Sequence, residues 1–444
     1  MSVPLVLLFV GGGACASAIA VFLLPRPLLV LNIAIVLYLY PFGLRPINVG
    51  PLFDYATDGM IALALCAWLL HAPFQRQPIR WNVAWLLLAF FIFWASVTLL
   101  WATDVVEGRK SLVAFLLGSI LLFLVVQQVR TIREIDGVMR CLMIVGWTVV
   151  IAGLLTVRFG GYQSGDRLKI GDLNENALGV LLTLMLAGVI WPVLRSSGRT
   201  RLVYMAISAA YILSTVILVL LSGSRGSTIS LVVMLLAFWF WRPLRPWAKI
   251  GSALVAGALM VAPFLLLAIQ NRSSEDTGNE LGSRDILWTA AWRLIQDHPF
   301  TGVGLGNGPI ELRPYIAALT SDYAKHFGLP AHNPFLEVGC DTGFIGMLLY
   351  AGVVISALWQ FFYNRRRLDV GGAALSAYFP LVLVCAVGYI SSFIKSGGME
   401  NHPTFFALMA LLLIPSQIAP QYAAKQAWRP EDTPLSSATL RLQH

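Results

Sequence analysis

Long apolar runs are the feature that most constrains the fold of this chain. In a lipid bilayer every backbone N–H and C=O must be paired within the protein, so only helices or closed barrels can cross it. These runs are roughly 15–25 residues long, as transmembrane helices require, and lack the alternation of barrel strands. The sequence therefore predicts an all-α polytopic membrane protein. The thirteen candidate runs fall near residues 3–24, 27–44, 59–71, 82–101, 111–129, 137–157, 175–194, 201–222, 227–241, 247–269, 334–361, 373–394 and 403–419.

The composition supports this class. Charged residues make up 12% of the chain, against about 25% in a soluble domain. All five cysteines lie inside apolar runs without a Cys/His cluster, which predicts small buried side chains, with neither disulfides nor a metal site. The net charge of +9 is spread along the chain. It favours contact with anionic lipid or phosphate, and the small loops exclude a nucleic-acid-binding module.

Basic loops recur after every second run, which the positive-inside rule assigns to the cytoplasm. They contain Arg76 and Arg80; Arg130, Arg133 and Arg140; Arg195, Arg199 and Arg201; Arg242, Arg245 and Lys249; and Arg365, Arg366 and Arg367. The polar segment 270–333 then faces outside. Pro25 and Pro27 interrupt the first apolar stretch, and a break there gives about 12 transmembrane helices with both ends of the chain inside. The alternative is thirteen spans with the N-terminus outside.

This topology divides the chain into four parts. Residues 1–269 form an N-terminal helix bundle, 270–333 a large external loop or lid, 334–419 the C-terminal transmembrane helices, and 420–444 a cytoplasmic tail. The absence of a basic segment before the first run predicts a first helix rather than a cleaved signal peptide.

The external segment carries an amphipathic helix signal. Ser283 is a candidate N-cap, and Pro299 marks the end of the helix. Trp288 and Trp292 stand one turn apart and suit a membrane interface. Apolar residues recur with the helical period at Leu287, Ala290, Ala291, Leu294 and Ile295. The following glycine series, 302–308, predicts a tight packing loop, because it lacks the Lys-Ser/Thr of a phosphate-binding loop.

His332 stands where the external segment returns to the apolar run that starts at 334. Histidine exchanges protons near neutral pH, although a solvated interfacial histidine is the alternative. Glu337 and Asp341 lie four residues apart on one helical face. Acids next to a bilayer are costly unless they face a wet cavity or a partner.

Several sequence blocks resemble the O-antigen ligase family, within the O-antigen ligase/polymerase superfamily of membrane glycosyltransferases. They are Ser222-Gly223-Ser224-Arg225-Gly226, the segment 283–288 followed by 298–306, and His332-Asn333-Pro334-Phe335-Leu336-Glu337. A weaker block joins Gly165-Asp166-Arg167 to Asn174-Glu175-Asn176. Together the blocks cover roughly residues 160–350.

The resemblance implies a GT-C-like membrane protein with a periplasmic helical lid. Such a protein transfers a glycan from undecaprenyl pyrophosphate to a sugar of the lipid A–core at the periplasmic face of the bacterial inner membrane. It implies neither a metal nor another cofactor. The essential residues of the family, a histidine and arginines before it, map onto His332, Arg284 and Arg225.

The chemistry of the reaction fits these residue types. A departing pyrophosphate needs positive charge in place before reaction, and guanidinium groups bind phosphate oxygens in bidentate fashion. Arg225 lies at the break between two apolar runs, where a charge is costly and usually functional. Arg284 near a helix N-terminus would form an anion site. His332 would act as general base, in a reaction that inverts the anomeric carbon. The candidate substrate-binding residues are Arg167, Lys169, Asn176, Asn333 and Glu337.

Three alternatives remain open. A covalent route through Glu337 or Asp341 is less favoured. A polymerase that extends the glycan, or a protein O-oligosaccharyltransferase, belongs to the same superfamily, and the spacing of Arg293 and Gly304 is also associated with polymerases. A lipid-linked glycan transporter would need inverted repeats and polar midplane helices, whereas the polar blocks here concentrate on the outer side.

Overall fold

The computed structural model describes residues 22–40, 50–73, 79–160, 168–170, 173, 175–239, 274–321, 327–370, 373–396 and 402–427. Within these ranges the chain is helical except for turns and one isolated β-bridge between Ile170 and Leu173. The helices are α2 (Pro27–Leu39), α3 (Gly50–His71), α4 (Val83–Thr98), α5 (Val105–Gln128), α6 (Ile132–Phe159), α7 (Glu175–Arg195), α8 (Gly198–Ser222), α9 (Arg225–Trp239), α11 (Ser274–Asp297), α12 (Gly308–Glu311), α13 (Arg313–Ala317), α14 (Pro334–Tyr363), α15 (Arg365–Val370), α16 (Ala373–Ser396) and α17 (His402–Ala427).

Eleven of the thirteen predicted apolar runs coincide with helices. The run at 247–269 and almost all of the run at 3–24 lie outside the described residues. In the described ranges, six helices are long and apolar enough to cross a membrane, and five apolar helices are shorter. These findings support a multi-pass membrane protein, while the total of about 12 spans stays a prediction. The six are Phe53–His71, Val105–Gln128, Ile132–Phe159, Ala177–Arg195, Gly198–Ser222 and Pro334–Tyr363.

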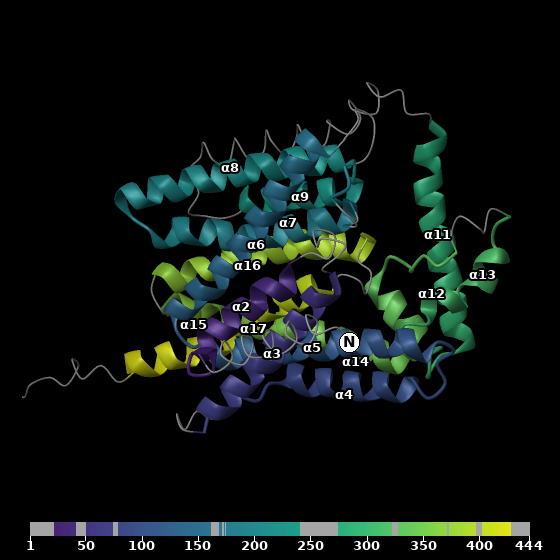
Figure 1. Ribbon diagram of the computed structural model, residues 1–444, viewed down its shortest axis with the longest axis horizontal. Coiled ribbons are helices and arrows are strands. Elements are labelled where there is room, and N and C mark those ends of the chain that lie inside the picture. Colours follow the sequence, from purple (N-terminus) through teal and green to yellow (C-terminus); the bar gives the residue numbers. More distant parts are fainter. Residues whose placement is uncertain are drawn as a thin grey trace, which may run out of the picture.

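The apolar helices lie side by side as a bundle, and α11 runs across one end of it (Figure 1). Helix α7 packs against α6, α8 and α16, while α14 packs against α4 and α17. One continuous apolar core joins these helices, with the largest buried side chains including Trp191, Tyr378 and Phe91. The bundle therefore has two distinct ends, and α11 to α13 lie at one of them (Figure 1).

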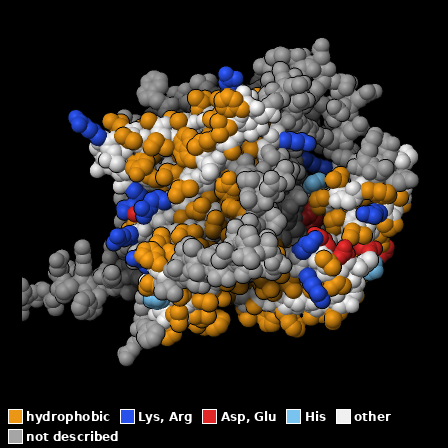
Figure 2. All heavy atoms as spheres, in the orientation of Figure 1, with side chains coloured by type: hydrophobic (Ala, Val, Ile, Leu, Met, Phe, Trp, Pro, Cys, Tyr) orange, Lys and Arg blue, Asp and Glu red, His pale blue; other side chains and the backbone are white. Residues whose placement is uncertain are grey.

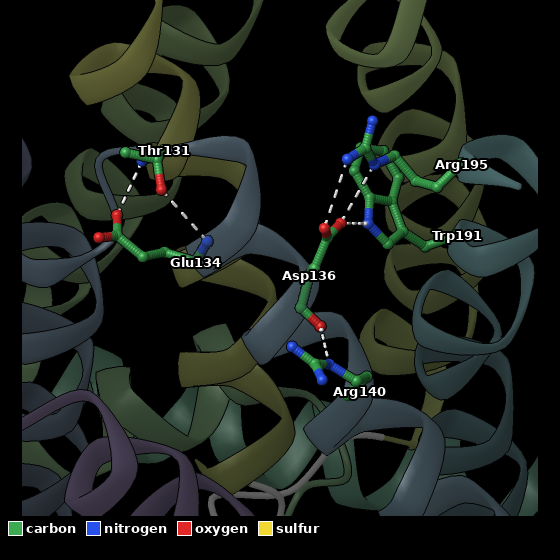
Figure 3. Close-up of polar contacts among 6 residues, drawn as sticks. All are labelled: Thr131, Glu134, Asp136, Arg140, Trp191 and Arg195. Atoms are coloured by element: carbon green, nitrogen blue, oxygen red, sulfur yellow. Dashed lines mark hydrogen bonds and ion pairs between the residues drawn. The ribbon is translucent and has the colours of Figure 1, made fainter.

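The end of the bundle away from α11 is rich in arginine. We define this arginine-rich end by the turns at 79–82, 129–131 and 196–197 together with α15; Lys and Arg side chains gather there at the left of Figure 2. A network of polar contacts fixes the start of α6 to the end of α7 (Figure 3). Asp136 accepts a hydrogen bond from Trp191 Nε1 at 2.7 Å and pairs with Arg195 at 3.3 Å. We define the opposite end, with α11 to α13, as the site end.

Two local predictions are wrong. Helix α11 begins at Ser274, not at Ser283. The sequence Glu275-Asp276 in the first turn suits the positive end of the helix dipole, and Gly278 and Gly282 cost only about 1 kcal/mol each inside a helix. Cys66 is exposed rather than buried, whereas Cys141, Cys340 and Cys385 are buried.

The contact between α6 and α7 gives a test of the packing. A Cβ on Gly188 would lie 2.6 Å from Leu142 Cβ, so Gly188→Ala forces the two helices apart. We expect a loss of stability of roughly 1–3 kcal/mol, the usual cost of overpacking, measured as a lower melting temperature of the detergent-solubilised protein. Gly59→Ala is the matched control, because no atom lies within 4 Å of its added Cβ. Equal melting temperatures for the two variants would contradict this packing.

Candidate functional site

A kink in α14 receives the glycine turn of the external segment. Gly343 breaks the helical geometry of α14 with φ 69° and ψ −172°. The kink exposes backbone groups, and Phe344 N donates to Pro299 O at 2.7 Å. Val303 N and Gly304 N donate to the carbonyls of Cys340 and Asp341, each at 2.9 Å. The glycine turn is therefore joined to α14 by main-chain hydrogen bonds.

The Asp341 carboxylate completes this junction. It accepts from Gly306 N at 2.7 Å and from Gly308 N at 2.8 Å, one bond to each oxygen. The side chain is only 2% exposed. Gly302 has φ 61°, and a Cβ there would overlap the Asp341 backbone. Because both carboxylate oxygens bind backbone amides, the geometry gives Asp341 a structural role and does not favour it as a nucleophile.

Asn307 connects the same turn to the bundle. Its Oδ1 accepts from Asp104 N at 2.6 Å, and its Nδ2 donates to the carbonyls of Asp104 and Leu305. Leu305 N donates to Thr98 Oγ1 at 3.1 Å. These bonds reach the connection between α4 and α5, so the glycine series is a tight packing loop, as predicted. The sequence analysis did not single out Asn307, although a polar residue within a glycine series was the available signal.

The predicted apolar face of α11 is confirmed. All five predicted residues are buried in a small core that is separate from the core of the bundle. This core also contains Leu312 between α12 and α13, Ile316 of α13, Cys340 of α14 and Ala331, the residue before His332. Helix α11 therefore packs its apolar face on protein, over the end of the bundle, rather than on lipid.

His332 stands at the junction of this small core and α14. Its φ of 52° makes it the one non-glycine residue with positive φ in the described ranges. The preceding carbonyl, of buried Ala331, accepts from Trp288 Nε1 at 2.9 Å. The following residue, Asn333, caps α14 by accepting from the amides of Phe335 and Leu336. His332 is thus held from both sides, and Trp288 has a specific polar contact that the interface prediction missed.

The electrostatic environment keeps His332 neutral. Burial lowers the pKa of its imidazole, and the nearby positive charge of Arg284 lowers the pKa further. Arg284 lies inside α11, ten residues after its start, so the predicted anion site at a helix N-terminus is wrong. The structure nevertheless brings Arg284 close enough to His332 for their charges to interact.

Two other predicted residues adjoin His332. Asn333 uses its side-chain oxygen as the helix cap rather than leaving it for a ligand. Glu337 is in the first turn of α14, is 6% exposed, and its amide donates to Asn333 O at 2.9 Å. Arg284, His332, Asn333 and Glu337 therefore form one group at the site end, which we call the His332 group.

Three further candidates, Lys169, Asn176 and Arg225, lie at a second position, the break between α8 and α9. Gly223 ends α8 with φ 64°, and Arg225 begins α9. Leu168 N donates to Leu221 O at 3.0 Å, which places the exposed Lys169 beside this break. Gly179 of α7 approaches Ser227 so closely that an added Cβ would collide with it, which brings the first turn of α7, with Asn176, next to α9.

At this second position, the structure describes only the backbone of Arg225 and Asn176. The side chains of Arg225 and Asn176 and the whole of Arg167 lie outside the described residues. Basic, acidic and histidine side chains surround a recess near α11 and α14 at the right of Figure 2. Among the described residues, no group of three or more His, Cys, Asp or Glu is placed to hold a metal ion.

Comparison with known proteins agrees with the sequence blocks. A family model described as O-antigen ligase matches residues 209–351, which run from α8 through the His332 group into α14. The teichuronic acid biosynthesis protein TuaE of Bacillus subtilis (strain 168) is 23% identical over 368 residues. That alignment covers 74% of this chain and 70% of TuaE.

The pKa of His332 provides a direct test of the group. We expect a value below the ordinary 6.5, and a higher value in Arg284→Gln, because that variant removes a repulsive charge. Histidine ring NMR in detergent micelles measures both, with His332→Gln to assign the signal. The unfolded state then binds more protons, so the group's contribution to stability falls as pH drops through 6.5. If the His332 pKa were unchanged in Arg284→Gln, the charges of the two side chains would not interact and the grouping would be refuted.

Proposed function

Since the chain belongs to the O-antigen ligase/polymerase superfamily, we propose that it is an O-antigen ligase. It transfers a polysaccharide from undecaprenyl pyrophosphate to a sugar of the lipid A–core. The observation that carries the proposal is the His332 group, in which a neutral imidazole stands beside the Arg284 guanidinium at the end of a membrane bundle. A base and a phosphate-binding cation are the two groups that this transfer needs.

The distribution of charge supports a periplasmic site. Positive charge in short loops marks the cytoplasmic side of a membrane protein, and the arginine-rich end carries such loops. The His332 group lies at the opposite end. In this proposal the protein sits in the inner membrane, and α11 to α13 form the lid over a pocket that opens to the periplasm.

The proposed reaction is a direct displacement. An acceptor hydroxyl attacks the anomeric carbon of the donor, and the bond from that carbon to the pyrophosphate oxygen breaks. The hydroxyl proton passes to an imidazole nitrogen of His332, an effect worth about 10²–10⁴-fold in rate. The negative charge that develops on the pyrophosphate is stabilised by Arg284 and by Arg225, with Arg167 and Lys169 as further contacts. One displacement inverts the anomeric carbon.

The two members of the pair also influence each other. Before the donor binds, the Arg284 charge lowers the pKa of His332 and keeps the imidazole ready to accept a proton. A pyrophosphate bound to Arg284 offsets that charge, which raises the basicity of His332. The base would therefore become stronger only when its substrate is present. Glu337, buried in the first turn of α14, would help to orient the imidazole.

A glycan polymerase is the second candidate. The name of the similar protein TuaE places it in teichuronic acid biosynthesis. This similarity favours a polymerase as the second candidate for this chain. Analysis of lipopolysaccharide from a deletion strain separates the two functions. Loss of a ligase leaves bare core and accumulated lipid-linked polymer, whereas loss of a polymerase leaves core that carries a single repeat.

Substitution of the base tests the proposal. We expect His332→Ala and His332→Gln to reduce glycan transfer by about 10²-fold or more, because each variant removes the imidazole that accepts the hydroxyl proton. Transfer is measured by lipopolysaccharide gel analysis after complementation of the deletion strain. Membrane levels and melting temperatures close to wild type show that the variants fold. Normal glycan attachment by His332→Ala would refute the assignment.

The hydrogen bond from Trp288 to Ala331 allows a test of whether glycan transfer depends on the exact position of His332. Trp288→Phe keeps an aromatic ring but removes the Nε1–H that binds Ala331 O. We expect kcat to fall by roughly tenfold with little change in KM, because a base out of position slows the chemical step. Trp292→Phe is the control, since Trp292 is 46% exposed and its described contact is with the Phe344 ring. The same effect from both variants would show that the loss is one of general packing.

A further inference from the structure

A second basic site lies at the arginine-rich end and takes no part in the proposed transfer. Arg80 precedes α4 and Arg130 follows α5, and Gln127 binds both. Gln127 Nε2 donates to Arg80 O at 2.9 Å, and its Oε1 accepts from Arg80 N at 3.2 Å. Arg130 Nε donates to Gln127 O at 2.9 Å. One glutamine thus fixes two arginines from different turns next to each other.

In the described ranges, both guanidinium groups donate their hydrogen bonds to neutral oxygens. Arg80 Nη1 donates to Gln417 O at 2.6 Å and to Gln417 Oε1 at 3.3 Å. Arg130 binds only the carbonyl of Gln127 through Nε. Neither arginine forms an ion pair with a carboxylate in the described ranges. Within these ranges the remaining N–H groups of each fork have no carboxylate partner, and a bound anion would supply one.

The carboxylate of Glu134, whose charge acts on Arg130, already binds the start of α6. Glu134 accepts from the amides of Arg130 and Thr131 through Oε2, and Thr131 caps α6 in return (Figure 3). Its charge offsets only part of the repulsion between the arginines. Burial lowers the pKa of both guanidinium groups, and the charge of Arg80 lowers that of Arg130 further. An anion bound between them would relieve this cost.

The surface beside the two arginines is apolar. Trp81 and Val83, which follow Arg80 directly, are 83% and 63% exposed, and Leu86 on the next turn is 58% exposed. A half-buried pair of cations above such a surface matches a molecule with a phosphate at one end and hydrocarbon chains at the other. Free phosphate would satisfy the arginines but would leave the apolar side chains uncovered.

We propose that Arg80, Gln127 and Arg130 form a binding site for the phosphate of an anionic phospholipid, whose acyl chains lie along α4. The two guanidinium forks bind the phosphate oxygens, and Gln127 holds them at a fixed spacing. Because Arg80 also binds Gln417 of α17, the bound lipid would join α4, α5 and α17 at the membrane surface. The site is independent of the His332 group, so it stands whether or not the transfer reaction is as proposed.

Native mass spectrometry of the full chain in neutral detergent tests the site with phosphatidylglycerol, phosphatidylcholine and inorganic phosphate as separate probes. We expect phosphatidylglycerol to bind in preference to phosphatidylcholine, with millimolar inorganic phosphate unable to displace it. The double variant Arg80→Gln/Arg130→Gln should lose affinity for phosphatidylglycerol by about tenfold or more, because it removes two charge-assisted phosphate contacts.

The matched control is Arg199→Gln/Arg201→Gln. It removes the same charge from exposed positions on α8 at the same end of the bundle. Unchanged affinity in the control separates a specific site from general attraction to a basic surface. An equal loss in both double variants, no loss in the first, or displacement by inorganic phosphate would each overturn the proposal. If the first double variant fails to fold, Arg130→Gln alone gives the same comparison, because it leaves the bond from Arg80 to Gln417 intact.

Discussion

The carboxylate of Asp341 is the interaction on which the site end depends. It binds the amides of Gly306 and Gly308, and so attaches a turn of the external segment to a helix of the bundle more than thirty residues later in the chain. Removing one partner of such a buried group leaves an uncompensated polar atom, which costs about 1–3 kcal/mol. Through this junction the small core beneath α11 is held in register with α14.

That register is what places His332. The imidazole lies between a carbonyl fixed by Trp288 and the cap of α14, in a left-handed backbone conformation that costs roughly 1–2 kcal/mol for a residue other than glycine. Strain of this kind persists only where the surroundings determine the geometry. Here the surroundings come from three separate segments. The imidazole therefore keeps its position only while α11, the turn at Ala331 and the start of α14 stay packed together.

The two ends of the bundle use arginine in different ways. At the site end, Arg284 stands beside a titratable base and lowers its pKa, an arrangement suited to chemistry on a charged donor. At the arginine-rich end, Arg80 and Arg130 are held by amide oxygens without a base between them, an arrangement suited to binding alone. Both settings fit phosphate-bearing lipids.

The sequence by itself determined the features that depend on local period and length. Apolar runs predicted the helices, and the spacing of Leu287, Ala290 and Leu294 predicted the buried face of α11, because helix geometry repeats every few residues whatever lies opposite. Only the tertiary structure decided the roles of Asp341, Asn307 and Trp288, because their partners lie 33 to more than 200 residues away in the chain. Arg284 shows the difference: its pattern predicted a helix N-terminus, but its partner is His332, 48 residues later, which only the folded chain brings within reach.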